Sequence, residues 1–355
     1  MSRRCRLAAT ASGVQVSPAA VVGNLTAWMT EKGAVTQVAF DGEDWRVEGS
    51  DKINTSEALV RIPEKLAITT YDVREHDLIA EVAEGRDDFV GLTLWVLAEL
   101  AKGPNSSWSE YLTSLPAERS GGALSPIFWT PEERAELLKG SPVLELAEQR
   151  SAAMDAEYAA LEEGLQKALA DYPPAAYSQE AFRRAFGMVL ARVTYLPSAG
   201  VLALIPLADS LPLTSGSGAV LDYDVETGEV MVYADRAYGP GEKVEITDTQ
   251  TRPNSELMLC RGEVDMNNVE DYMEYTVELL RIDPLYNVKK EILLASQLEE
   301  TQVFPLYSDR FPQQLLCYLR LTRIQNTEEL MKVRQDLLPI ALFVAPFTDV
   351  HGCER

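Results

Sequence analysis

The spacing of apolar residues changes character three times along this chain. Between Val38 and Pro63, apolar and β-branched residues alternate with polar and turn-forming ones, which predicts short strands of a hairpin-rich sheet. From Asp77 to about Leu100, apolar residues recur every three or four positions, as in an amphipathic helix. Alternation returns within residues 201–207 and 220–238, and helical spacing follows from Val264 to the end. This order predicts an α+β protein with a helical insertion and a helical C-terminal domain.

Start, stop and turn signals define four elements more closely. Thr130 followed by Pro131 is a typical helix start, because the threonine hydroxyl caps the first turn and proline fits its first position. Residues 154–170 are rich in Ala, Glu and Leu and end before two prolines, and residues 178–193 begin with a capping serine, so both stretches predict helices. The turn Glu226-Thr227-Gly228 joins two alternating runs and predicts a hairpin.

The charge balance restricts the class of partner. The chain of 355 residues has 55 Asp and Glu against 32 Lys and Arg, a formal net charge of −23. Such a surface repels a phosphate backbone, which argues against nonspecific binding of DNA or RNA. A protein partner with a basic or lysine-bearing segment is the expected one.

The sequence predicts neither a metal site nor a transmembrane helix. The four cysteines form no CxxC pair and only two histidines are present, so the spacings predict no zinc or iron–sulfur site. No apolar run reaches about 18 uninterrupted residues, so no transmembrane helix is expected.

The first twenty residues have two interpretations. They contain arginine, alanine and serine, and no acidic residue occurs before Glu31, which suits an organelle transit peptide. The same composition also suits a disordered start of a cytoplasmic protein.

Four motifs between Leu202 and Gly262 carry a family resemblance. LALIPLADS, LDYD, DRAYGPGEKVEIT and RPNSELMLCRG follow one another in this order. The order resembles the catalytic half of SET-domain protein-lysine methyltransferases, in the branch that includes the Rubisco large-subunit methyltransferase. The segments SSWSEYLTSLP and SPIFWTPEERAELLKGS are similar to the helical insert of that branch, and FPQQLLCYLRL is similar to its C-terminal domain.

The resemblance implies a domain plan. A β-rich, split SET domain is expected over residues 21–262, with its helical insert at about 77–192. An all-helical, Rubisco-methyltransferase-type substrate-binding domain is expected over residues 263–355, truncated relative to the family.

The resemblance also implies S-adenosylmethionine as the cofactor. Arg192 and Asp209 match the family's cofactor-site arginine and the aspartate of its Asp-x-x-Asn-His run, while Pro212 and Leu213 replace the Asn and His. Proline has no N–H and leucine has no polar side chain, so the family's hydrogen bonds at these two positions are absent.

The family's Gly-x-Gly turn falls near residues 44–46, where both glycines are replaced. Glu43 and Trp45 of this region are the candidate cofactor contacts. Gly42 offers a shifted turn, because glycine tolerates conformations that other residues avoid.

The family's two tyrosines beside the transferred methyl group are also replaced, by Asp248 and Arg261. No catalytic residue can therefore be assigned by the resemblance. Tyr223 is a candidate for the substrate channel, and the alternative is that it packs in the core of its strand.

Two hypotheses follow. The first is a protein-lysine N-methyltransferase, with chloroplast import favoured by the resemblance and a cytoplasmic location as the alternative. The second is a catalytically inactive SET-fold binding or scaffold protein, favoured by the joint replacement of the Asn-His, Gly-x-Gly and tyrosine positions.

Overall fold

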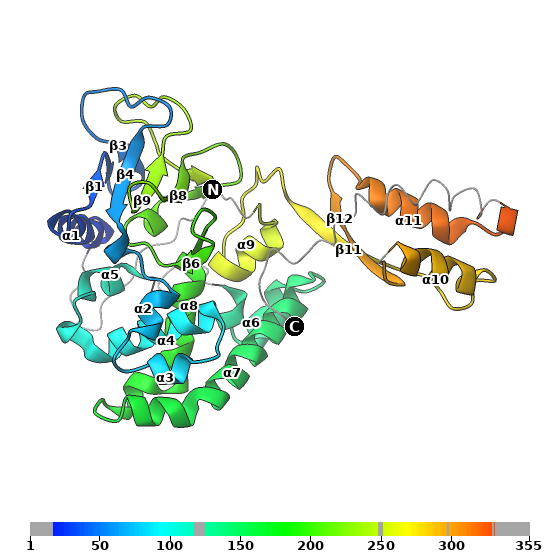
Figure 1. The fold of residues 1–355 in the computed structure, drawn as a ribbon, viewed down its shortest axis with the longest axis horizontal. Helices are drawn as coiled ribbons and strands as arrows, with labels where there is room; N and C mark the ends of the chain where they lie inside the picture. Colours follow the sequence, from blue (N-terminus) through cyan, green and yellow to red (C-terminus); the bar gives the residue numbers. More distant parts are fainter. Residues whose placement is uncertain (1–16, 117–124, 248–250, 297, 329, 331–355) are drawn as a thin grey trace. The chain divides into compact units, whose positions relative to one another are not determined.

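The computed structural model describes residues 17–116, 125–247, 251–296, 298–328 and 330. The chain divides into two compact units (Figure 1). Unit 1 comprises residues 1–249 and 254–267, and unit 2 comprises residues 250–253 and 268–355.

A four-stranded antiparallel sheet is the largest sheet of unit 1. Its strand order is β1-β4-β9-β8, formed by β1 (Val35–Thr36), β4 (Ala58–Pro63), β9 (Glu229–Tyr233) and β8 (Val220–Asp224). Val60 lies opposite Val232 at its centre, and both side chains are fully buried. The predicted hairpin at 226–228 is confirmed, and Gly228 adopts φ 70° in its turn, a conformation that glycine accepts at low cost.

Three two-stranded pairs accompany this sheet. They are the antiparallel pairs β2 (Val38–Phe40) with β3 (Trp45–Val47) and β5 (Thr194–Leu196) with β6 (Val201–Ala203), and the parallel pair β7 (Leu213–Thr214) with β10 (Ile246–Thr247). The strands predicted in residues 38–63 are thus confirmed, and β7 with β10 joins two segments that lie on either side of the hairpin.

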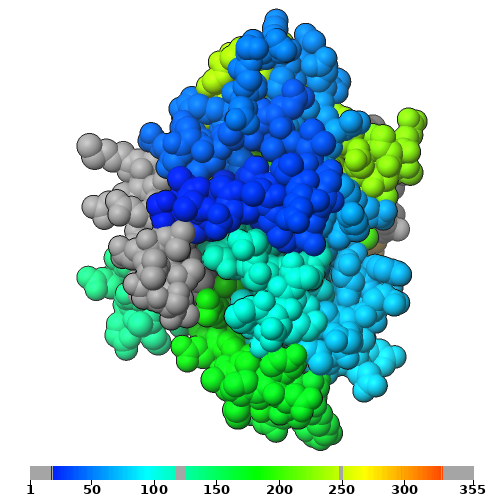
Figure 2. Space-filling view, turned by 90° about the vertical axis from the view of Figure 1, so that its left-hand side faces the viewer, coloured from blue at the N-terminus to red at the C-terminus, as the bar shows by residue number. Residues whose placement is uncertain are grey.

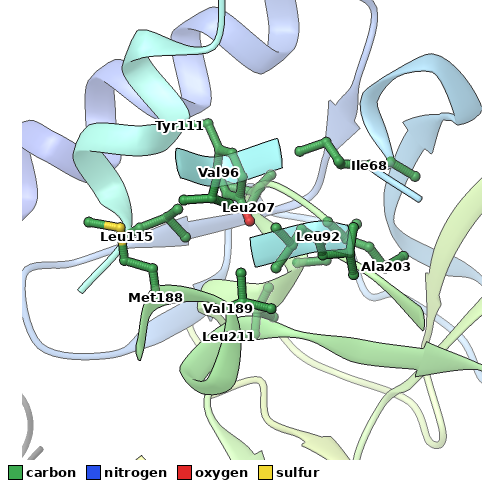
Figure 3. Packing of buried hydrophobic residues seen from close by; sticks show 14 of the residues in the cluster. Ile68, Leu92, Val96, Tyr111, Leu115, Met188, Val189, Ala203, Leu207 and Leu211 are labelled. Atoms are coloured by element: carbon green, nitrogen blue, oxygen red, sulfur yellow. The ribbon is translucent and has the colours of Figure 1, made fainter. Parts of the chain in front are cut away.

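Helices occupy most of the sequence between the two halves of the strand-rich region. The described ones are α2 (Thr70–Arg74), α3 (Ala80–Ala83), α4 (Asp88–Lys102), α5 (Ser109–Ser114), α6 (Pro131–Leu137), α7 (Val143–Ala168) and α8 (Gln179–Arg192), with 3₁₀ turns η1 (Glu64–Leu66), η2 (Gly103–Asn105), η3 (Pro126–Phe128) and η4 (Pro174–Tyr177). α4 packs against α5 and α8 through the buried side chains of one continuous core (Figure 3).

The helix starts predicted at Thr130 and Ser178 are confirmed, because Thr130 and Glu133 form a capping box and the Ser178 hydroxyl accepts from the N–H of Ala181. The single helix expected from Asp77 to Leu100 is wrong. The chain is interrupted at Gly85, with φ 75°, and α4 starts afresh with Asp87 as its N-cap.

Helix α1 (Pro18–Glu31), capped by Ser17, was not expected from the sequence. It lies across one face of unit 1, with α5 beside it (Figure 2). Trp28 of α1 contacts Trp108 at 5.6 Å between ring centroids, and Trp108 contacts Trp95 of α4 at 5.3 Å. These aromatic contacts connect α1 to the helical insert.

Unit 2 combines a hairpin with helices. β11 (Tyr272–Glu278) and β12 (Thr301–Tyr307) pair antiparallel over their whole length, and α10 (Tyr286–Ala295) and α11 (Gln313–Arg323) supply the other elements. The all-helical unit expected after residue 263 is therefore wrong in this respect. Four of the seven residues of β11 are β-formers, namely Tyr272, Tyr275, Thr276 and Val277, and pairing with a strand some thirty residues later overrides the local helical spacing. The small core is formed by Leu279, Ile292, Leu293, Phe304, Leu315, Tyr318, Leu321 and Leu330.

A buried ion pair in unit 2 supplies a stability prediction. The Lys289 side chain is fully buried, and its ammonium donates to Asp283 at 2.5 Å and to the Thr322 carbonyl at 3.1 Å. We expect Lys289→Met to lower the free energy of unfolding by about 2 kcal/mol, because both acceptors lose a charged donor. Denaturant unfolding followed by circular dichroism measures this, with the partly exposed Lys290→Met as the control. Equal midpoints for the two variants would contradict the prediction.

Among the described helices, none combines the length and the apolar composition that a membrane crossing needs.

Candidate methyltransferase site

The segment after β6 makes a strained turn in the core of unit 1. Leu207 is fully buried and has φ 73° and ψ −57°, a conformation that a leucine rarely adopts. The Ser210 N–H and hydroxyl both donate to the Leu207 carbonyl, at 3.1 and 2.5 Å. Such conformations cost about 1–3 kcal/mol and concentrate at functional sites. The turn presents the 3₁₀ helix η5 (Ala208–Ser210), and with it Asp209, to the helical insert.

Asp209 carries a buried carboxyl group. It is 5% exposed, and the hydroxyl of Tyr111 from α5 donates to its Oδ2 at 2.6 Å. Burial raises the pKa of Asp209 to about 6, although the charges of Arg192 and Arg261 and the Tyr111 hydroxyl act in the opposite direction. Burial, reinforced by the carboxylate, raises the pKa of Tyr111 well above its usual value, so the tyrosine remains a donor. Figure 3 shows Tyr111 among the core residues that surround Leu207.

Arg192 is the last residue of α8 and reaches the same turn. Its Nη1 donates to the backbone carbonyl of Asp209 at 2.6 Å. Within the part of the chain that the structure describes, Nη2 and Nε of Arg192 make no hydrogen bond. A half-buried guanidinium with one edge unused by protein is suited to a carboxylate, which it can bind through two parallel hydrogen bonds.

Trp45 of β3, in the N-terminal part of the strand-rich region, contacts the same turn. Its side chain is buried, and the indole N–H donates to the Ser210 carbonyl at 3.1 Å. Phe40 packs against its ring at 5.7 Å between centroids. The indole donor is thus already used inside the protein, so Trp45 acts here as a support of the Asp209–Ser210 backbone.

The turn between β2 and β3 lies at 41–44. Gly42 adopts φ 102°, and the Asp41 carboxylate accepts from the N–H groups of Glu43 and Asp44 at 2.8 and 2.7 Å. Arg46 binds Asp41 at 2.5 Å across the turn. Glu43 has an exposed position on this turn, two residues before the buried Trp45.

Pro212 and Leu213 enter the parallel pair of strands. The Pro212 carbonyl accepts from the N–H of Ile246 at 2.8 Å, and Leu213 lies opposite Ile246 in β7 and β10. The two residues therefore serve backbone pairing, and neither supplies a side-chain hydrogen bond to the site.

Arg261 ends α9 (Asn254–Arg261), and its charge acts on the Asp209 carboxyl. The helix is anchored by Glu256, whose carboxylate receives two hydrogen bonds of 2.9 Å from Arg150 of α7. Asn254 binds the backbone of Asp265 in both directions, at 3.0 and 2.8 Å. Asp248, the other residue at a family tyrosine position, lies outside the described residues.

Tyr223 lies on β8 opposite Val230. Burial and the neighbouring Glu64 carboxylate raise the pKa of Tyr223. No hydrogen bond or ion pair between described residues joins it to Arg192, Asp209 or Trp45.

The contacts connect Arg192, Asp209 and Trp45 of the predicted set. Tyr111 and Ser210 were not predicted. Tyr111 lies within the SSWSEYLTSLP motif of the helical insert, and a buried tyrosine hydroxyl needs a hydrogen-bond partner, which was the available signal. Among the described residues, no cluster of three or more His, Cys, Asp or Glu side chains could hold a metal ion.

Comparison with solved structures identifies this architecture. The SET domain of the Rubisco large-subunit methyltransferase (LSMT), crystallised with lysine and S-adenosylhomocysteine (AdoHcy), superposes with a TM-score of 0.71 at 21% identity, over 91% of this chain and 76% of that chain. Rubisco LSMT bound to S-adenosylmethionine (AdoMet) gives 0.70 at 23% identity, over the same shares. This chain has the SET-domain methyltransferase fold. The predicted fold class is confirmed, apart from the hairpin in unit 2.

Sequence relatives agree with the SET fold. The chain is 26% identical over 328 residues to actin-histidine N-methyltransferase of Gallus gallus, covering 86% of this chain and 53% of that protein. It is 27% identical over 320 residues to chloroplastic [fructose-bisphosphate aldolase]-lysine N-methyltransferase of Arabidopsis thaliana, covering 85% and 64%. This chain therefore spans between half and two thirds of the length of these relatives. Residues 281–340 match the family described as Rubisco LSMT substrate-binding. The predicted resemblance to SET-domain protein methyltransferases of the Rubisco-methyltransferase type is confirmed.

Proposed function

We propose that this SET-fold chain is a protein N-methyltransferase that uses S-adenosylmethionine as methyl donor. The observation that carries the proposal is the position of Arg192, whose guanidinium is fixed by the Asp209 carbonyl while Nη2 and Nε remain available within the described structure. That donor set fits the carboxylate of the cofactor's methionine part. The relatives with methyltransferase names and the AdoMet-bound structure of the same fold support it.

The fit differs between the two ends of the cofactor. Arg192 would hold the carboxylate and Asp209, through its charge, would favour the cationic end. At the family's Asn-His positions Pro212 and Leu213 provide no side-chain hydrogen bond for the adenine end. When bound, the cofactor supplies an electrophilic methyl group, and the protein's task is to align a nucleophile with it. We therefore expect binding in the micromolar range, because Pro212 and Leu213 offer the adenine end no side-chain hydrogen bond.

A lysine side chain is the proposed acceptor. Only the neutral amine attacks a methyl group, and roughly one lysine in 2,500 is neutral at pH 7 in water. A nearby cation such as Arg261 disfavours the ammonium form and so lowers the pKa of an incoming lysine. Among the relatives both lysine and histidine enzymes occur, so the test must include both acceptors.

The proposed partner is a protein with a basic or lysine-bearing segment, since the chain carries a net charge of −23. Import into a chloroplast is proposed from the basic, Ala- and Ser-containing first twenty residues and from the chloroplastic relative. Expression of this chain with a C-terminal fluorescent protein in plant cells tests the location. Plastid fluorescence is expected, and diffuse cytoplasmic fluorescence would contradict the proposal.

The second candidate function is a SET-fold scaffold without methyl transfer. Two hydrogen bonds favour it. The Trp45 indole N–H donates to the Ser210 carbonyl, and the Pro212 carbonyl accepts from the Ile246 N–H, so both groups bind the protein's own backbone instead of a cofactor.

Calorimetric titration with S-adenosylmethionine distinguishes the two. We expect saturable micromolar binding by the folded protein, followed by transfer of labelled methyl groups to a library of lysine-containing peptides, with matched histidine peptides alongside. Transfer to histidine alone would refute the proposed acceptor while retaining the enzyme. Folded protein without detectable binding would refute the enzyme and leave the scaffold.

A further inference from the structure

Tyr111 lies beside a buried carboxyl that also feels the charges of two arginines. The Asp209 side chain faces Tyr111 from α5, and the charges of Arg192 at the end of α8 and Arg261 at the end of α9 act on it. These are the titratable and charged groups that act on Asp209 in the described structure. Tyr111 is the one that donates a hydrogen bond to the carboxylate itself.

The backbone next to Asp209 is held in a strained conformation by hydrogen bonds. Leu207 has positive φ, the Ser210 carbonyl is bound by Trp45, and the Asp209 carbonyl is bound by Arg192. Main-chain contacts thus fix the turn from two sides, while Tyr111 fixes the Asp209 side chain. Because Tyr111 is fully buried and its hydroxyl is hydrogen-bonded, its side chain has little freedom to adopt another position.

We propose that Tyr111 is a positioning residue of the methyltransferase site, which acts by keeping Asp209 in the ionised form beside Arg192 and Arg261. This inference rests on the proposed function. With Asp209 ionised, the side chains of Asp209, Arg192 and Arg261 together carry a net charge of +1. With Asp209 protonated, their net charge is +2. S-adenosylmethionine is itself cationic near neutral pH, because its sulfonium and ammonium outweigh its carboxylate, so protonation of Asp209 weakens its binding.

The sign of the pH effect follows from the pKa of Asp209. Burial raises it to about 6, so the carboxylate forms as the pH rises through that value and cofactor affinity rises with it. We expect the wild-type protein to bind S-adenosylmethionine about tenfold more tightly at pH 7 than at pH 5. The range stops at pH 7 because a free α-amino group titrates near pH 8 and would change the charge of the ligand.

The variants separate positioning from simple support. Tyr111→Phe keeps the ring but removes the donor that favours the carboxylate, so the pKa of Asp209 should rise and the affinity measured at pH 6 should fall about fivefold below that of the wild type. Asp209→Asn keeps the shape but cannot titrate, so its affinity should be low and constant from pH 5 to pH 7. The control is Tyr158→Phe, which removes a hydroxyl that donates to the Tyr177 carbonyl at 3.2 Å, and its profile should match that of the wild type.

Isothermal titration at five pH values measures these profiles on folded protein. A wild-type profile without pH dependence, or a Tyr111→Phe affinity at pH 6 equal to that of the wild type, would overturn the inference and leave the proposed function intact. Absence of binding at every pH would overturn the proposed function and this inference with it.

Discussion

Replacement of Arg192 by alanine is expected to weaken S-adenosylmethionine binding about 100-fold. The guanidinium reaches the site from the end of α8, and its Nη1 is held by the Asp209 carbonyl at 2.6 Å. A pair of charge-assisted hydrogen bonds to a carboxylate contributes about 2–3 kcal/mol, which corresponds to that factor. Calorimetry at pH 7 measures the loss.

Two further variants make the Arg192 result specific. Arg184→Ala removes an exposed arginine from the same helix and should leave affinity within twofold of the wild type. Arg192→Lys keeps a positive charge but loses the planar pair of donors, so it should recover only part of the affinity. If Arg192→Ala and Arg184→Ala bind equally well, Arg192 is not the carboxylate site.

The unfolding transition of Arg192→Ala gives a second check on this variant. The lost contact to the Asp209 carbonyl is a single hydrogen bond at a half-buried position, so we expect a decrease of about 1 kcal/mol in the free energy of unfolding. A folded variant with strongly reduced binding is the expected combination.

Elements with their own local signals were predictable from the sequence. Thr130 before Pro131 and the capping serine Ser178 each mark a helix start, and Gly228 marks a hairpin turn, because all three effects depend on neighbouring residues. The hairpin of β11 and β12 was missed, because the two strands are separated in sequence by a helix. Neither strand has a strong sequence pattern on its own, and each is stabilised by pairing with the other.

The site divides in the same way. Arg192, Asp209 and Trp45 were predicted from motif positions, and hydrogen bonds to the backbone of residues 209 and 210 join them next to the turn at Leu207. The positive φ of Leu207 could not be predicted from its residue type, because leucine rarely adopts positive φ. The bond from Tyr111 to Asp209 joins positions 98 apart in sequence, which periodicity cannot pair. Packing of the insert against the strand-rich half creates both features.

Replacement of Gly218 by alanine is expected to destabilise unit 1 by about 3 kcal/mol. A Cβ atom on Gly218 would lie 2.7 Å from the Glu245 carbonyl oxygen and 2.9 Å from a methyl carbon of Thr214. Neither distance is tolerable, and Glu245 cannot retreat easily because the N–H of Ala219 donates to that same oxygen at 2.8 Å. Denaturant unfolding followed by tryptophan fluorescence measures the change.

Gly216→Ala is the matched control for this substitution. It lies two residues earlier in the same loop, and its added Cβ would meet only the Thr214 hydroxyl oxygen, at an ordinary contact distance of 3.5 Å. The stability of Gly216→Ala should stay within about 0.5 kcal/mol of the wild type. Equal stability of the two variants would show that the backbone near Gly218 can relax.

The Gly218 variant should also lose cofactor affinity, for a different reason from Arg192→Ala. Gly218 exchanges two hydrogen bonds with the Thr247 hydroxyl, at 2.8 and 2.9 Å, next to the pairing of β10 with β7. A shift of β10 would move β7, which begins at Leu213, four residues after Asp209. Arg192→Ala is expected to lose binding with little loss of stability, whereas Gly218→Ala is expected to lose both. That contrast tests whether the parallel pair of strands supports the site, because a Gly218→Ala protein that is destabilised yet binds normally would separate the strand pair from the Asp209 turn.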